Sequence, residues 1–463
     1  MSVTPAADPA PSPPASGRKR WHVGTLTYTT GALVMLFCWL LAGDFAWQLK
    51  ERAAPPVVQI MLRKFQASDF LSGLFLLSIP SAIGLFIGPI ICYRSDRHRG
   101  RWGRRIPYLL VTSPIATLSM AGMALGPVIG ARLHAWMGWS PASLNLTIIT
   151  VLGLSWTGFE FTTVAANAVF NGLVNDVVPE PIIGRFFGLF RAVSLISGMV
   201  FNFYLIGVAK EHFLPILLGI GVLYGGGMLA MCLLVKEGEY PAAPPPVPGE
   251  RRGFIAGLRT YGRECFSKPY YLWVLASIAL AQMAFIPVNL FSVYSAESFG
   301  LSMTLYGRYI VVMYACSLVL SYPLGWLADR FHPIRVGIGA IAGYAVLMGI
   351  GFYGTVGPRS FGLVFLAHGV LSGAYFTGAA ALGQRLFPHH RFAQFMAAWV
   401  QVLALGNIAL GPLMGLLLDL LGHDYRYTFG AGCLIALAAL ISGLVVLRRW
   451  HALGGDASYV APE

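Results

Sequence analysis

The sequence predicts an all-α integral membrane protein whose twelve transmembrane helices form two six-helix bundles. The first observation is composition: of 463 residues, 56% are hydrophobic and only 11% are charged, whereas a soluble globular chain has about 25% charged residues. The second is a series of apolar runs, six before a proline-rich break and six after it, each near the roughly 20 residues that a membrane crossing needs. The third is an Asp-Arg string that follows the second run and returns after the eighth, as expected of a parallel repeat of two bundles.

Composition and charge exclude other classes of protein. So few charged residues cannot cover a water-soluble body of this size, which excludes a soluble enzyme, a nucleic-acid-binding protein and a disordered scaffold. The net charge of +13 follows from membrane topology, because with a cytoplasmic N-terminus most of the 32 Lys and Arg fall in cytoplasmic segments. The six cysteines lie mostly inside apolar runs without paired spacing, so neither a disulfide framework nor a metal site is expected.

The chain divides into five predicted segments. It begins with a stretch rich in Pro, Ala and Ser, and prolines interrupt it again between Pro241 and Pro248. The segments are a disordered cytoplasmic tail, a first bundle, a cytoplasmic linker, a second bundle and a second cytoplasmic tail, at residues 1–24, 25–235, 236–268, 269–449 and 450–463. Both termini are then cytoplasmic in a multi-pass protein of the plasma membrane.

A cytoplasmic loop of the first half carries the charged string. Asp96-Arg97 is followed by Gly103-Arg104-Arg105. One interpretation is a plain positive-inside anchor. The other is a conformational latch, in which Asp96 lies near a helix N-terminus and the arginines pair across helix ends that separate when the bundles rock.

The longer string resembles a known family signature. Ser95-Asp96-Arg97 with Arg101-Trp102-Gly103-Arg104-Arg105-Ile106-Pro107-Tyr108 resembles the loop of the major facilitator superfamily. More narrowly, it is similar to the glycoside–pentoside–hexuronide:cation symporters and the sucrose-transporter-like proteins, as is Phe45-Ala46-Trp47-Gln48-Leu49 in the first helix. The resemblance implies the facilitator fold and gives Asp329-Arg330 the latch role in the second half. Cys92 stands where the family usually has Gly, and Glu160 where it usually has Asp.

Glu160 is the strongest single candidate for ion coupling. It lies inside an apolar run, where a carboxylate is costly and indicates function. At 100° per residue, Asn167 and Asn171 share its helical face, so we expect them to bind substrate hydroxyls; the resemblance also assigns the coupling acid to this helix. The alternative is a hydrogen bond between packed helices. Arg191 would need a partner, either Asp176 or Glu160.

The first helix supplies a second set of candidates. Asp44, Gln48 and Arg52 follow i, i+4, i+8 spacing with Trp47 beside them. If the helix ends early, Arg52 lies in an outer loop. The sucrose-type resemblance instead carries the helix past Pro55, and these groups then face the cavity, where carboxylate, amide and guanidinium groups beside aromatic rings suit a sugar. Asp44 is also a candidate for cation or proton coupling.

Weaker candidates complete the substrate-binding set. Arg185 resembles the substrate-side arginine at the start of the fifth helix in melibiose permease, but an interfacial anchor is an equal alternative. Gln282 and Asn289 are i, i+7 on the seventh helix and could reach the substrate, or join helices as neutral amides. For Arg308 and His368 we expect snorkelling or core packing.

These features predict a monomeric secondary transporter that carries a sugar or glycoside together with H⁺ or Na⁺ by alternating access, and not an enzyme. It needs no cofactor beyond the coupling ion, no metal and no nucleic acid; its partners are the small-molecule substrate and the lipid bilayer. No GxxxxGK nucleotide motif occurs, so ATP-driven transport has no support. Two alternatives are a facilitator-type carrier of a non-sugar organic solute and a non-transporting membrane assembly or pigment-delivery factor of the same fold.

Overall fold

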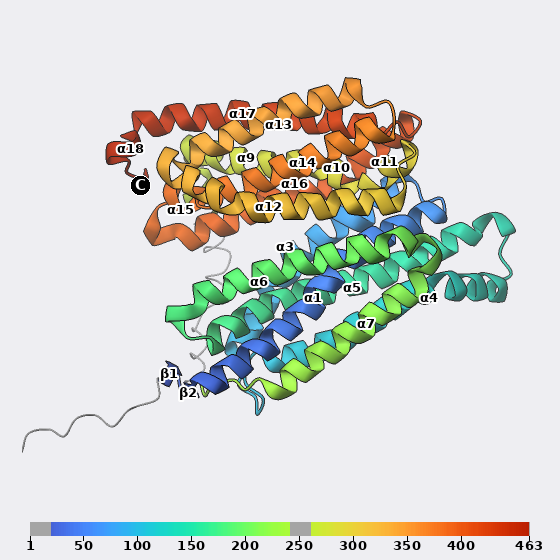
Figure 1. Cartoon of the computed structure of the whole chain (residues 1–463), viewed down its shortest axis with the longest axis horizontal. Helices are drawn as coiled ribbons and strands as arrows, with labels where there is room; N and C mark the ends of the chain where they lie inside the picture. The colour runs from blue at the N-terminus through green and yellow to red at the C-terminus, as the bar shows by residue number, and fades with distance from the viewer. Residues whose placement is uncertain (1–19, 241–260, 463) are drawn as a thin grey trace, which may run out of the picture.

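The structure, a computed structural model, describes residues 20–240 and 261–462. Helices dominate both halves (Figure 1). The first half contains a hairpin of two strands and a series of helices, with short π and 3₁₀ segments between them: β1 (Arg20–Val23), β2 (Leu26–Thr29), α1 (Thr30–Lys64), α2 (Asp69–Gly73), η1 (Leu74–Ser78), α3 (Ile79–Arg97), α4 (Ile106–Met137), η2 (Pro141–Ser143), α5 (Leu144–Val177), α6 (Glu180–Val200), η3 (Phe201–Leu205), η4 (Ile206–Val208) and α7 (Ala209–Leu234).

The second half repeats this plan with more breaks. It contains α9 (Pro269–Ala284), α10 (Ile286–Leu290), α11 (Ser292–Ser298), α12 (Met303–Phe331), α13 (Pro333–Gly354), α14 (Pro358–Gly378), α15 (Leu382–Leu386), η5 (His389–Arg391), α16 (Phe392–Leu420), α17 (Arg426–Ala452) and α18 (Gly455–Ser458).

The helices are long and apolar enough to cross a membrane. In the described ranges, 11 continuous segments qualify, and one of them, Glu180–Leu234, has 55 residues. At 1.5 Å per residue a straight helix of that length would measure about 80 Å, well beyond a hydrocarbon core of about 30 Å. The chain instead turns back at η3 and η4, so α6 and α7 are separate crossings (Figure 1). The predicted all-α membrane fold with twelve crossings in two bundles is confirmed.

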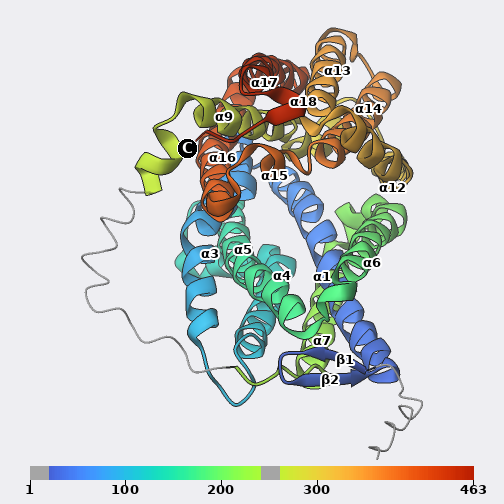
Figure 2. The ribbon, with the colours of Figure 1, turned by 90° about the vertical axis from the view of Figure 1, so that its left-hand side faces the viewer.

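The two halves are joined mainly at one end of the molecule. Among the described residues, side-chain hydrogen bonds between the halves gather where α2 meets α16 and where α11 lies beside the first half. We name this the closed end. The opposite, open end carries the hairpin, residues 98–105 and α18, and Figure 2 views the molecule from that side, with α1 and α6 facing α12 and α15.

The chain before the first crossing differs from the predicted tail. Arg20 pairs with Thr29 in an antiparallel hairpin that turns at Gly24, where φ is +52°. Trp21 packs on the apolar core of the first bundle, and the Thr29 hydroxyl accepts a hydrogen bond from the Ala32 amide at the start of α1. The predicted tail at 1–24 therefore ends in a strand, because an aromatic side chain can be buried there; residues 1–19 and 241–260 of the predicted tail and linker lie outside the described residues.

Helix α1 continues past two prolines, which decides between the alternatives for Arg52. Pro55 and Pro56 lie inside the helix, which runs on to Lys64. Since proline has no amide hydrogen, the carbonyl oxygens of Glu51 and Arg52 lose their usual helix donors. Such backbone is tolerated at membrane depth where it lines a cavity, and all four residues do so.

Candidate functional site

A cavity of about 820 Å³ lies between the two halves at mid-depth. Helices α1 and α6 form its wall in the first half, and α10, α11, α12 and α14 form the facing wall. The lining side chains mix charged, amide, hydroxyl and aromatic groups, among them Glu51, Arg52, Gln59, Arg191, Asn202, Asn289, Ser292, Tyr306, Tyr314, Ser317, Ser321, Phe365, His368, Ser372 and Thr377. Two predicted substrate-binding residues, Arg52 and Asn289, therefore line this cavity.

Two arginines lie on the wall formed by the first half. Arg52 donates from Nη2 to Ser194 Oγ on α6 (2.9 Å) and from Nη1 to the Tyr314 hydroxyl on α12 (3.4 Å). Its Nε is buried without an acceptor. Arg191 is exposed to the cavity, and among the residues that the structure describes it has no hydrogen-bond or ion-pair partner.

The cavity also offers acceptors and ring faces. The side-chain oxygens of Gln59 and Asn202 are buried without a donor. On the opposite wall, His368 Nε2 lies 3.0 Å from Asn289 Oδ1, and His368 Nδ1 lies 2.9 Å from the Tyr344 hydroxyl. The Phe365 ring stacks on the His368 ring with centroids 6.0 Å apart. His368 thus positions Asn289, a role that sequence reasoning passed over in favour of core packing.

A buried ammonium group lies beside the cavity. The Lys50 side chain is 0% exposed, and its Nζ lies 2.8 Å from Glu51 Oε1 and 2.7 Å from Thr163 Oγ1. It also lies 4.0 Å from the Trp47 ring centroid, 4.6 Å from that of Phe159 and 5.0 Å from that of Tyr224. Aromatic faces and one carboxylate compensate for the lost hydration of the ammonium.

Glu160 belongs to the same charged cluster. It is partly buried on α5, one turn before Thr163, and it interacts electrostatically with Glu51 and Lys50. Within the described chain it has no hydrogen bond and no ion pair, and its electrostatic interactions are with Glu51 and Lys50. The role of Glu160 in ion coupling stays a prediction, and Arg191 is not its partner in this structure.

Other predicted substrate-binding residues lie outside the cavity lining. Asp44 is 1% exposed and accepts a hydrogen bond from Gln48 Nε2 (3.1 Å), while its Oδ2 is buried without a donor. Trp47 is buried against Phe170 and Lys50. Trp47 therefore packs between α5 and α7 inside the first bundle, while the roles of Asp44 and Gln48 stay predictions.

The remaining predicted positions are more scattered. Asn167 and Asn171 are exposed on α5, where Asn171 Nδ2 donates to Asn167 Oδ1 (2.9 Å). Arg185 is exposed at the start of α6. Gln282 lines a separate pocket of about 160 Å³, which shares Phe376 with the central cavity.

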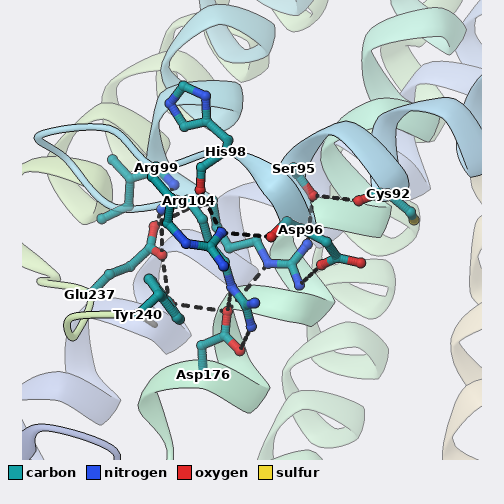
Figure 3. A network of polar contacts seen from close by, with 11 residues as sticks. Cys92, Ser95, Asp96, His98, Arg99, Arg104, Asp176, Glu237 and Tyr240 are labelled. Atoms are coloured by element: carbon teal, nitrogen blue, oxygen red, sulfur yellow. Dashed lines mark hydrogen bonds and ion pairs between the residues drawn. The ribbon is translucent and has the colours of Figure 1, made fainter. Parts of the chain in front are cut away.

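The charged loop forms a network with two other helix ends of the first bundle (Figure 3). Arg104 pairs with Asp176 at the end of α5 through Nε (2.9 Å) and Nη2 (2.5 Å), which raises the pKa of the Arg104 guanidinium. Arg105 bridges Asp96 and Asp176 and donates to Ser95 Oγ (2.6 Å). Asp176 is thus committed to two arginines, so the predicted pairing of Arg191 with Asp176 is wrong.

Glu237, just after α7, caps the start of α4. Its carboxylate accepts hydrogen bonds from the amides of Arg104 (2.9 Å), Arg105 (2.8 Å) and Ile106 (2.7 Å), and from the Tyr240 hydroxyl (2.7 Å). Burial and this carboxylate raise the pKa of Tyr240 above its usual value. Gly103 has φ +95°, and a Cβ there would lie 2.5 Å from the Glu237 carboxyl carbon, which explains the glycine.

The contacts of this network described above lie within the first bundle, and its role as a latch between the bundles stays a prediction. All its described contacts join helix ends of the first half, and Arg97 stacks on Tyr93 of its own helix, 4.1 Å from the ring centroid. In the second half, Arg330 lies over the Trp326 ring at 5.2 Å, while Asp329 is exposed. The arginines do pair across helix ends, as the latch interpretation expects, but here they hold one bundle together.

Replacing Glu237 with alanine is expected to lower the stability of the purified protein by about 1–2 kcal/mol, because three helix-capping hydrogen bonds are lost. Thermal unfolding in detergent measures the effect. Glu239→Ala removes an exposed carboxylate from the same segment and should leave the unfolding temperature unchanged. Glu237→Gln should lower the unfolding temperature less than Glu237→Ala does. Equal behaviour of the two alanine variants would contradict the capping role.

The closed end is held by a polar cluster from both halves. Asp419 accepts hydrogen bonds from the amides of Asp69 (2.9 Å) and Phe70 (3.0 Å) at the start of α2. His423 Nδ1 lies 2.7 Å from Asp69 Oδ2, and the Tyr425 hydroxyl donates to Asp69 Oδ1 (3.0 Å). One potential metal-ligand atom from each of Asp69, Asp419 and His423 lies within 4.8 Å of the other two, near enough to hold a metal ion. Each of these side chains already has a hydrogen-bond partner in the cluster.

Glycines bring the two backbones together at this end. A Cβ added to Gly411 of α16 would lie 2.4 Å from the Gly73 carbonyl oxygen, and one added to Gly415 would lie 2.2 Å from the Asp69 carbonyl oxygen. Both contacts are with backbone, which cannot move aside as a flexible side chain can. Any side chain at these positions would separate α16 from α2.

Two bundles that enclose a mid-depth cavity define the major facilitator fold, and the comparisons with known proteins agree. Residues 287–452 match the sequence model of the Major Facilitator Superfamily. None of the curated proteins matches the chain.

Solved structures resemble the chain over most of its length. A bacterial homolog of the human lysosomal transporter Spinster, in an inward-facing and occupied conformation, aligns with a TM-score of 0.63 and 14% identity over 91% of this chain and 97% of that one. A bacterial homologue of the iron transporter ferroportin in its inward-facing state aligns with a TM-score of 0.64 and 15% identity, over 89% of this chain and 99% of that one. A D-xylose-proton symporter aligns with a TM-score of 0.59 and 14% identity, over 88% of this chain and 96% of that one. Identities this low show the fold alone, and together with the long apolar helices they indicate a multi-pass membrane protein with the facilitator fold.

Sequence reasoning missed three functional features: Lys50, Glu51 and the cap by Glu237. If the first helix ended early, Lys50 and Glu51 would lie in an outer loop together with Arg52. An adjacent Lys and Glu also look like an ordinary exposed pair. The signal that could have found them is the pair Pro55-Pro56, which indicates helix that lines a cavity when apolar sequence resumes after it. Glu237 is a single acidic residue beside a basic loop, and its contact depends on tertiary structure.

Proposed function

We propose that this protein is a secondary active transporter of the plasma membrane that carries a small polar solute, a sugar or glycoside, by alternating access and couples it to H⁺ or Na⁺. The observation that carries the proposal is the polar cavity of about 820 Å³ between two bundles that meet at one end. A cavity at mid-depth between repeated halves is the expected site of a secondary transporter.

The open end is proposed to face the cytoplasm. The basic loop Arg94 to Arg105 lies there, as the positive-inside rule favours. The fold comparison is consistent with an inward-facing state, since the ferroportin homologue aligns at 0.64 in its inward-facing structure and at 0.54 in its outward-facing one. The polar cluster of Asp69, Asp419 and His423 is then the outer gate.

A carbohydrate fits the chemistry of the cavity. Unpaired oxygens of Gln59 and Asn202 and the free carbonyls of Glu51 and Arg52 accept from hydroxyl groups, while Phe376, which is 48% exposed in the cavity lining, offers a ring to the apolar side of a sugar. The narrower resemblance to glycoside–pentoside–hexuronide:cation symporters agrees with this choice. A cavity lined in this way gives little support to a pigment-delivery factor.

Glu160 is proposed to couple the ion. It lies one helical turn from Thr163, which together with Glu51 binds the Lys50 ammonium, and Glu51 lines the cavity. When Glu160 takes up a proton, its negative charge is lost and Glu51 becomes the carboxylate that compensates the Lys50 ammonium. The electrostatic potential at the cavity wall therefore changes. Asp44, buried with one oxygen unpaired, is the second candidate.

The test is sugar-driven proton movement in proteoliposomes that contain a pH indicator. Glu160→Gln is expected to abolish proton movement but to keep counterflow of radiolabelled sugar, because glutamine resembles the protonated acid in charge and shape. Glu180→Gln, an exposed change at the start of α6, is the matched control. Unchanged proton movement in Glu160→Gln would contradict coupling through this residue, and a dependence of wild-type uptake on a sodium gradient would make Na⁺ the ion.

A further inference from the structure

We propose that a small pocket among α9, α14, α15 and α16 binds a planar ring that carries a hydrogen-bond donor and an acceptor on one edge. We name it the side pocket; its lining includes Gln282, Tyr375, Phe376, Phe392, Met396 and Trp399. Phe376 is the lining residue that it shares with the central cavity. The side pocket is a second site beside the proposed transport site, so its ligand can be tested without knowing the transported solute.

The size of the side pocket fits a single six-membered ring. Its volume is about 160 Å³, and an apolar cavity of about 150 Å³ in a protein core admits benzene. The central cavity, at about 820 Å³, is much larger. The side pocket is therefore too small for a whole glycoside and large enough for one ring.

Aromatic side chains from two helices form the walls of the side pocket. Tyr375 and Phe376 come from α14, and Phe392 and Trp399 come from α16. The Phe376 ring is 48% exposed and stands edge-on to the Tyr375 ring, with centroids 6.1 Å apart. A further ring can meet such side chains in offset or T-shaped contacts, and the Met396 thioether also packs well on aromatic rings. These walls favour a flat ligand over a puckered one.

An amide group gives the side pocket its polar edge. Gln282 is partly buried on α9, and among the residues that the structure describes its side chain has no hydrogen-bond partner. A primary amide presents a donor and an acceptor side by side, and leaving such groups unpaired away from water costs free energy. A ring with a neighbouring donor and acceptor can pair with both amide atoms, as glutamine does with the edge of adenine.

A break between two helices also favours a ligand in the side pocket. Helix α14 ends at Gly378 and α15 begins at Leu382, and Ala379 and Ala380 between them line the pocket. Non-helical backbone at membrane depth is tolerated where protein buries it or where it lines a cavity. A bound ring would cover this backbone and contact α15, which faces the first half at the open end (Figure 2).

Two sources can supply such a ring. One is a free aromatic compound, which would bind independently of the transported solute. The other is the aglycone of a glycoside whose sugar lies in the central cavity, on the other side of Phe376. Both sources present the same chemistry to Gln282 and to the aromatic walls.

The experiment uses 2-pyridone, a flat ring with an N–H and a C=O group on one edge. Its binding to the purified full-length protein in nanodiscs is measured by fluorine NMR, in competition with 5-fluoro-2-pyridone, and empty nanodiscs give the background. Wild type is expected to bind 2-pyridone saturably. The affinity should be at least about fivefold higher than for N-methyl-2-pyridone, which lacks the donor, or for 2-piperidone, whose ring is puckered.

Three variants test where the ring binds. Gln282→Leu removes the amide and should weaken 2-pyridone binding about tenfold, as expected for two lost hydrogen bonds. Ala380→Leu fills the pocket and should weaken binding by at least as much. Ala397→Leu adds the same side chain at an exposed position of α16 outside the pocket lining and should bind 2-pyridone as wild type does. Unfolding temperatures show whether each variant is folded.

Phenyl glucoside and methyl glucoside distinguish the two sources. Tighter binding of phenyl glucoside that Ala380→Leu abolishes identifies the ring as an aglycone, whereas equal or absent binding of both glucosides identifies a free compound. The inference is overturned if 2-pyridone does not bind saturably, if 2-piperidone binds equally well, or if binding survives both Gln282→Leu and Ala380→Leu. Counterflow of sugars tests the proposed transport function separately, so failure at the side pocket would leave that function standing.

Discussion

Replacing both Glu51 and Glu160 with glutamine is expected to destabilise the protein by about 3–5 kcal/mol, the cost of a buried charge left without its partner. The Lys50 ammonium is 0% exposed, and the two carboxylates are its charged neighbours. Each single replacement should cost much less, because the other carboxylate still compensates. Denaturant or thermal unfolding of the purified variants measures the difference, with counterflow as a second readout.

The control for this effect is a triple variant. Adding Lys50→Met removes the buried charge and keeps an unbranched apolar side chain against Trp47, Phe159 and Tyr224. We expect the triple variant to recover most of the lost stability without recovering ion coupling. If the double variant is as stable as wild type, or if Lys50→Met worsens it, the three groups do not form one charge cluster.

Replacing Gly411 with alanine is expected to disfavour the closed end by about 1–3 kcal/mol, the usual cost of overpacking, which lowers the ratio of closed to open molecules by a factor of roughly 5 to 150. The new Cβ would lie 2.4 Å from the Gly73 carbonyl oxygen. The clash exists only while the halves touch, so the variant should fold and open at this end. Transport should fall by a similar factor.

Pulsed electron paramagnetic resonance can follow the opening. Spin labels at Trp136 and Val356, which are 81% and 84% exposed, report the separation of the two halves at the closed end in a background without native cysteines. Gly406→Ala, on the same helix, is the matched control, because its Cβ would meet the flexible Met283 side chain. An unchanged distance distribution in Gly411→Ala would contradict a gate built on backbone contact.

The fold was predictable because its determinants are periodic and local. Apolar runs, the basic loops and the returning Asp-Arg string each depend on near neighbours in the chain. The hairpin at residues 20–29 was missed because short strands lack a strong pattern and Trp21 is half-buried against an apolar core formed by residues that follow much later in the chain. The continuity of α1 could be reached only through the family resemblance, since Pro55 and Pro56 argue for a break when judged locally.

The site was predicted in part. Glu160 was chosen because a carboxylate in an apolar run is costly, and Arg52 and Asn289 were chosen by their helical spacing; Arg52 and Asn289 line the cavity. Helical spacing also selected Asp44 and Gln48, which are joined by one hydrogen bond outside the cavity lining, because spacing tells which residues share a face but not what covers that face. Lys50 was missed for the converse reason: three aromatic rings from two other elements and its own helix surround it, and chain order does not reveal them.

The glycine contacts between α16 and α2 also bear on the energetics of the cycle. Glycine has no side-chain rotamers to lose, so bringing these backbones together costs no side-chain conformational entropy. The closed end is therefore stabilised by a few hydrogen bonds, and since each contributes only about 0.5–1.5 kcal/mol net, the free-energy difference between the two states amounts to a few kcal/mol. A binding event worth a few kcal/mol can then reverse the balance, and a carrier that must release its cargo on every turnover depends on such reversibility.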